Sequence, residues 1–212
     1  MMPTLAAPPL GPQKERTAMK GSPGRMAAAA LRLGLVMAAP GTMQPQRHTE
    51  ADVRFMQGMI AHHAQAVTIA SLVPARSTRQ DMRLLAERID VSQRDEIAMM
   101  RRWLEKRHEQ APSLDSGPAH DAAGHQMLMP GMLTEEQMAE LARVTGPEFD
   151  RLFLEGMIRH HEGALTMVAQ LFATPGAGQE PELFGFASDV DADQRAEIRR
   201  MRAMLDAPPA PM

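Results

Sequence analysis

The chain has 212 residues, a net charge of -3 and no cysteine. The slightly acidic balance argues against nucleic acid as a partner, because proteins that bind nucleic acid present a basic face. The lack of cysteine excludes disulfides and thiolate metal sites, which leaves His, Met and carboxylates as candidate metal ligands. Methionine is abundant, with 20 residues.

Residues 1–46 are rich in Pro, Gly and Ala and show no amphipathic period. Within them, Lys20 and Arg25 precede an apolar run from Met26 to Pro40, which has the outline of a signal peptide. This pattern predicts export to the periplasm or the cell exterior. Arg32 interrupts the apolar run, and the alternative is a disordered Ala/Pro tail. No stretch reaches the length of about 20 apolar residues that spans a bilayer.

Residues 49–108 read as a first helical hairpin. Thr49 is a candidate N-cap, apolar residues recur at helical spacing from Val53 to Val73, and Pro74 is expected to end that helix. A capping-box pattern over 77–80 predicts a second helix from about 78 to about 108. No run alternates with a period of two residues, so strands are not expected.

Residues 109–133 form a Pro- and Gly-containing linker that carries His120, His125, Met127, Met129 and Met132. A second hairpin follows over 134–206. It comprises a short helix after the capping box of Thr134, a helix over about 147–172, a turn at 174–178 and a helix over about 181–205. Residues 207–212 are a Pro-rich tail expected to be disordered.

The two hairpins are duplicates. The sequence Phe-x-x-Gly-Met-Ile-x-His-His beginning at Phe55 recurs at Phe153, 98 residues later. The second helix of each hairpin also repeats, at an offset of 101 residues, so that Ile97 corresponds to Ile198. Two duplicated hairpins predict an all-α four-helix bundle over 47–206. The alternative is two hairpins that pair with other chains.

Helical spacing divides each His-His pair. His62 and His160 fall at the centre of an apolar stripe, whereas His63 and His161 lie at its flank. In the second helix of each hairpin, a Gln and a Glu share the core face. Because a buried imidazole or carboxylate without a partner is costly, we expect each Glu to lie opposite a central His. The predicted pairs are Glu96 with His62 and Glu197 with His160, accompanied by Gln93 and Gln194.

This polar core has two interpretations. One is a structural hydrogen-bond network with Met as flexible filler. The other is a metal site with His nitrogen and Met sulfur as ligands and with Gln93, Glu96, Gln194 and Glu197 as orienting partners. The linker favours the second, because loop Met and His residues without Cys suit Cu(I). The alternative is that the Met residues of the linker cover one end of the bundle as hydrophobic plugs.

The twin motif, with Met-Pro-Gly-Met-Leu-Thr-Glu-Glu-Gln-Met before its second copy, resembles the domain of unknown function 305 family over about residues 48–206. The resemblance implies a ferritin-like four-helix fold, frequent export and, in some members, copper binding through Met and His. Carried over by position, it indicates the ligands Met59, His62, His63, Met157, His160, His161, Met127, Met129 and Met132. The loop residues His120 and His125 join this candidate set.

The two halves differ at some positions. Ile69 stands where the second copy has Met167, and Ala64-Gln65 stands where it has Glu162-Gly163. If the halves bind metal unequally, these differences make the first half the weaker candidate for a metal site.

An enzyme is not expected. Di-iron centres need two Glu-x-x-His motifs, and only Glu105 with His108 has that spacing. No serine lies in a nucleophile-elbow motif. A zinc site of His and Glu would use nitrogen and oxygen ligands without Met. A metal ion is the expected partner, and homo-oligomerisation stays open.

Overall fold

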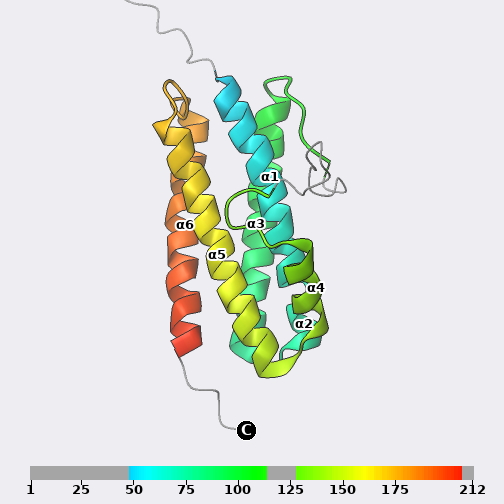
Figure 1. The fold of residues 1–212 in the computed structure, drawn as a ribbon. Coiled ribbons are helices and arrows are strands. Elements are labelled where there is room, and N and C mark those ends of the chain that lie inside the picture. The colour runs from blue at the N-terminus through cyan, green and yellow to red at the C-terminus, as the bar shows by residue number, and fades with distance from the viewer. Residues whose placement is uncertain (1–47, 114–127, 207–212) are drawn as a thin grey trace, which may run out of the picture. The chain divides into compact units, whose positions relative to one another are not determined.

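A computed structural model of the chain describes residues 48–113 and 128–206, and this part of the chain is all-helical, without a strand. The all-α class predicted from the sequence is thereby confirmed for these residues. The signal-like segment up to residue 46 and the tail 207–212 lie outside them. Figure 1 shows the helices, which are α1 (Glu50–Ala70), α2 (Val73–Arg76), α3 (Gln80–Glu105), α4 (Glu135–Arg143), α5 (Gly146–Ala173) and α6 (Pro181–Asp206).

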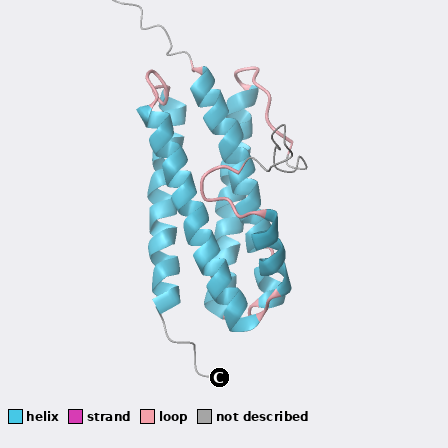
Figure 2. Ribbon diagram, in the orientation of Figure 1, coloured by secondary structure: helices cyan, strands magenta, loops and turns pink. Residues whose placement is uncertain are grey.

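The four long helices lie side by side as two pairs. Helix α1 packs against α3 and α5 packs against α6, and each pair runs antiparallel (Figure 1). Helices α1 and α5 also pack against each other and join the two pairs. Most connections turn at the ends of the helices, but the segment before α4 runs at mid-height along them (Figure 2). That segment proves central to the candidate site.

Helix α1 begins at the predicted cap. Thr49 Oγ1 accepts a hydrogen bond from the Asp52 backbone N–H at 3.2 Å, and Asp52 Oδ2 accepts one from the Thr49 N–H at 2.7 Å. The other carboxylate oxygen of Asp52 accepts from the Gly178 N–H at 2.7 Å, so one buried side chain ties α1 to the α5–α6 turn. A reciprocal cap of this kind stabilises a helix start by about 1 kcal/mol. Thr134 caps α4 in the same way.

Three other helix boundaries differ from the prediction. Helix α1 ends at Ala70, and Pro74 lies in the first turn of α2, where its missing N–H costs nothing. Helix α3 begins at Gln80 without a side-chain cap, because Ser77 Oγ instead accepts from the Arg79 N–H at 3.2 Å within the turn. It ends at Glu105, and His108 then takes a left-handed conformation, with φ of 59°.

The core is divided into two hydrophobic clusters with a polar layer between them. In α1, residues 55–60 join the first cluster and 66–70 join the second. In α5, residues 164–171 join the first and 149–157 join the second. The short stretches of α1 and α5 that lie between the two clusters carry all four His of the duplicated motif. The corresponding gaps in α3 and α6 carry Gln93, Glu96, Gln194 and Glu197. The fold therefore gathers the repeated polar residues at one level.

Candidate metal centre

His62 of α1 and His160 of α5 face each other where these two helices meet. Their ring centroids are 3.8 Å apart with 39° between the ring planes, and the residues are 0% and 1% exposed. Both rings point inward, as the helical spacing predicts. The two residues are equivalents in the duplicated motif, so the two copies of the motif meet here.

Both facing imidazoles are held in the neutral form. Burial, with the neighbouring His63 as the next cause, lowers the pKa of His62 to about 3. Burial likewise lowers the pKa of His160 well below its ordinary value, with further contributions from His62 and His161, and the nearby backbone of His62 acts in the opposite direction. A neutral imidazole keeps one nitrogen lone pair available, which is the form that binds a metal ion. The pair is therefore chemically ready to ligate.

The carboxylates pair with the other two His, contrary to the prediction. His63 Nε2 lies 2.5 Å from Glu96 Oε2, and His161 Nε2 lies 2.7 Å from Glu197 Oε2. The predicted pairs, Glu96 with His62 and Glu197 with His160, are wrong. Adjacent residues on a helix point about 100° apart. His62 and His160 therefore contact the opposite hairpin, whereas His63 and His161 contact the second helix of their own hairpin. All four rings are buried.

The Glu side chains lie between the buried rings and the surface. Glu96 is 15% exposed and Glu197 is 7% exposed, and Arg88 of α3 lies 3.7 Å from Glu197. Burial and the nearby carboxylates of Glu96 and Glu197 raise the pKa of the exposed Asp193 on α6. Carboxylates of α3 and α6 therefore gather outside the buried imidazoles, with Arg88 beside them.

Several buried polar atoms of this layer have no hydrogen-bond partner among the described residues. Neither ring nitrogen of His160 makes a hydrogen bond of good geometry. The amide of Gln93 is unpaired at both Oε1 and Nε2, and that of Gln194 is unpaired at Oε1. The remaining unpaired ring atoms are Nδ1 of His62, His63 and His161. Unpaired polar atoms in a core are costly, so this layer suits an ion or ordered water.

The linker segment 129–133 is docked against the facing imidazoles. His62 Nε2 donates to the Pro130 carbonyl oxygen at 3.0 Å. Gly131, with φ of 77°, lies against Gly163 of α5. A Cβ added at Gly163 would come within 1.9 Å of the Pro130 carbonyl oxygen. Gln65 holds the backbone of Leu133 with two hydrogen bonds, each of 2.9 Å. These hydrogen bonds therefore attach the linker to α1, although the bonded residues are 68 positions apart in sequence.

This docking brings methionine sulfur to within one helical turn of His62. Met129 Sδ and the Met167 methyl would lie 3.2 and 3.4 Å from a Cβ added at Gly58, one turn before His62. Both side chains line a groove of about 320 Å³ between α1 and α5, together with Pro130. The sequence does not predict Met167 as a ligand, and the only signal for it is that the first copy has Ile69 at that position. Gln65 and Gly163 likewise stand out in the sequence only as a difference between the copies.

The other predicted residues are distributed as follows. Met59 and Met157 are fully buried, one turn before each His-His pair, in the first and second hydrophobic cluster respectively. Met132 is partly exposed next to the docked Gly131. His120, His125 and Met127 lie outside the described residues. In residues 48–113 and 128–206, no three side chains of His, Asp or Glu converge in a way that could hold a metal ion.

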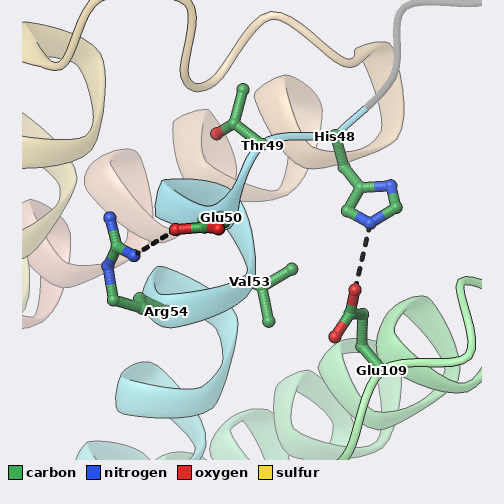
Figure 3. A pocket seen from close by; sticks show the side chains of 6 residues that line it. All are labelled: His48, Thr49, Glu50, Val53, Arg54 and Glu109. Carbon is green, nitrogen blue, oxygen red and sulfur yellow. Dashed lines mark hydrogen bonds and ion pairs between the residues drawn. The ribbon is translucent and has the colours of Figure 1, made fainter.

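A second hollow lies at the start of α1. His48 Nε2 is 3.4 Å from Glu109 Oε1 across a shallow pocket of about 310 Å³ that Arg54 also lines (Figure 3). The His48 ring also meets Trp103 edge-on, with centroids 5.5 Å apart. This group ties the segment before α1 to the segment after α3, and it shares no residue with the His layer.

Comparison with known proteins identifies the family. The profile of the domain of unknown function DUF305 matches residues 52–205, which include both hairpins and the docked linker. The chain belongs to the DUF305 family. No curated protein shows significant similarity to it. None of the helices in the described part of this DUF305 chain has both the length and the apolar character of a membrane span.

Several solved structures are similar to this chain in fold. A DUF305 fragment from Deinococcus radiodurans is 31% identical, with a TM-score of 0.63, over 75% of this chain and 97% of that one. A DUF305 protein of Streptomyces coelicolor that is proposed to be secreted is 31% identical, with a TM-score of 0.61, over 74% and 92%. CopM in its Cu(II)-bound form is 25% identical, with a TM-score of 0.56, over 72% and 94%.

Proposed function

We propose that this DUF305 protein binds copper, as Cu(I), through His and Met side chains. One observation carries the proposal: the hydrogen bond from His62 Nε2 to the Pro130 carbonyl, which fixes the Met-containing linker on the facing imidazoles. The contact brings the thioether of Met129 beside Gly58, within one helical turn of the neutral, buried ring of His62. Imidazole nitrogen with thioether sulfur is a donor set that favours Cu(I) over harder ions.

The residues present fit such an ion. Unpaired nitrogens on His62 and His160 offer lone pairs inside the core. Carboxylates are already engaged, since Glu96 and Glu197 hold the flanking imidazoles. A zinc site built from several His and Glu ligands is therefore disfavoured among the described residues. We infer that Met129, Met132, Met167 or the buried Met59 and Met157 supply sulfur, and that His120, His125 and Met127 of the linker extend the same donor set.

Relatives support this assignment. CopM, at 25% identity, has been crystallised in Cu(II)-bound and Ag-bound forms. Silver is a soft monovalent ion, like Cu(I), and selects the same ligands. These properties are those of CopM, and they come to this chain as part of the proposal.

The wider organisation belongs to the proposal too. We infer that α1, α3, α5 and α6 form a ferritin-like four-helix bundle of two duplicated hairpins, because equivalent His residues meet between the pairs. We further infer export to the periplasm or cell exterior, on the strength of the basic and apolar residues over 19–40. Copper handling outside the cytoplasm would suit a chain that avoids oxidisable cysteine ligands.

The test is an anaerobic Cu(I) titration of the full chain against a chromophoric chelator. The paired variant Met129→Leu with Met167→Leu should weaken binding by about tenfold or more, because even outer partners of a metal site are worth 10–100-fold. Met138→Leu, in α4, is the matched control and should bind as the parent does. X-ray absorption should detect both sulfur and nitrogen neighbours. No measurable Cu(I) affinity in the intact protein would overturn the proposal.

A structural role without metal is the second candidate. The two His–Glu pairs favour it, because they satisfy buried polar groups without an ion. It predicts that His62→Ala with His160→Ala changes thermal stability while the metal content of the purified protein stays at zero. Metal in protein purified from its native compartment would exclude this reading.

A further inference from the structure

The outer face of α3 carries exposed apolar side chains on one stripe. Leu84 is 55% exposed, Val91 is 56% exposed and Met99 is 44% exposed, and each is more than one-third accessible despite its size. Spacings of seven and eight residues keep them on one face of the helix, within about 80° of one another. A single exposed apolar residue needs no explanation, but three along one helix face indicate an interaction surface.

The duplication supplies an internal comparison for this stripe. At the offset of 101 residues, the equivalents of Leu84, Val91 and Met99 in α6 are Gly185, Ala192 and Arg200. The buried faces of the two helices match, as Ile97 matches Ile198, but the outer faces do not. A Cβ at Gly185 would meet nothing within 4 Å, so α6 has room for a side chain there. The fold itself therefore does not require the apolar residues of α3.

The stripe is complementary to a second copy of itself. We propose that the chain self-associates through α3, with two copies of the helix crossing antiparallel about a point between Val91 and Ser92. Arg88 and Asp95 lie about 5 Å on either side of that point along the helix axis, and Leu84 and Met99 about 11 Å. The twofold operation brings Arg88 against Asp95 of the second copy, and Leu84 against Met99.

Charge and exposure agree with this register. Arg88 is exposed, with 58% of its side chain accessible even though its Nε lies 3.7 Å from Glu197 Oε1, and Asp95 is also exposed. The same register brings Arg102, which is exposed at the end of α3, opposite Asp81, which is exposed at its start and also accepts hydrogen bonds from Arg79. Each unlike pair forms twice, as a closed twofold interface requires. In α6 the equivalents of Arg88 and Asp95 are Asp189 and Ala196, which cannot pair in this way.

One helix crossing buries less area than a standard protein interface, so the dimer should be weak. Sedimentation of the full chain from about 1 to about 500 µM should show a reversible monomer–dimer equilibrium, with the dissociation constant inside that range. Val91→Glu places two carboxylates at the crossing point and should raise that constant by about tenfold or more. The matched control is Ala192→Glu, the equivalent exposed position on α6, which should leave the constant unchanged.

A second probe does not depend on charge. The chain has no cysteine, so Val91→Cys introduces a single thiol next to the twofold axis. Under mild oxidation it should form a covalent dimer at least about ten times faster than Ala192→Cys at equal concentration. A monomer over the whole concentration range would overturn the proposal. So would a dimer that Val91→Glu leaves intact, or equal cross-linking rates at the two positions.

Discussion

Gly163→Ala tests whether the docked linker belongs to the candidate site. Gly163 lies inside α5, where alanine is ordinarily the better helix former by about 1 kcal/mol. The added Cβ would, however, come 1.9 Å from the Pro130 oxygen and 2.8 Å from the Gly131 Cα. Backbone atoms cannot rotate away as a side chain can. The linker must therefore retreat by about 1.5 Å or more to restore van der Waals distance.

That retreat breaks the contacts that hold the linker. It removes the hydrogen bond from His62 to Pro130 and strains the two between Gln65 and Leu133. At about 1 kcal/mol for each bond, less the helix gain, Gly163→Ala should lower the free energy of unfolding by about 1–2 kcal/mol. Urea unfolding measures this loss. Hydrogen exchange of the Leu133 amide, which donates to Gln65, should accelerate.

Gly185→Ala is the matched control. It is also an interior helix glycine, but its Cβ would meet nothing within 4 Å. It should stabilise the protein by up to about 1 kcal/mol. If both variants gain stability alike, and Leu133 exchange is unchanged, then the linker does not dock on α5 as described. If Gly163→Ala also leaves Cu(I) affinity intact, the linker has no part in metal binding.

Two further predictions concern the metal-free protein. Because burial lowers the pKa of His62 to about 3 and that of His160 in the same direction, only the unfolded chain takes up these protons between about pH 6.5 and 3. The free energy of unfolding should therefore decrease as the pH is lowered through that window, by up to about 1.4 kcal/mol per pH unit for each His. A urea midpoint that does not change with pH would refute this. Asp52→Ala should cost about 1–3 kcal/mol in urea unfolding, because it removes a cap and the Gly178 contact. A loss within error would mean that neither bond stabilises the fold.

Local chemistry explains what the sequence could predict. Thr49 and Thr134 cap their helices with residues only three positions away, so the pattern alone identifies those starts. The failure at Ser77 has the same basis, since its hydroxyl had a competing backbone partner two residues away, in Arg79. Inward orientation of His62 follows from helical spacing. The partner of Glu96 does not, because it depends on which helix covers which flank of α1.

The linker explains why the two copies of the motif are not identical. Gln65 and Gly163 occupy equivalent positions, 98 residues apart, yet one uses a long side chain and the other uses none. The Gln65 side chain forms two hydrogen bonds with the Leu133 backbone, whereas the missing side chain at Gly163 lets the backbone of Pro130 and Gly131 approach closely. A single linker packs on both copies of the motif, and one asymmetric segment cannot make the same contact with each. Divergence at this position is therefore what a docked linker requires. Restoring symmetry with Gly163→Gln or Gln65→Gly should detach the linker while both His–Glu pairs remain.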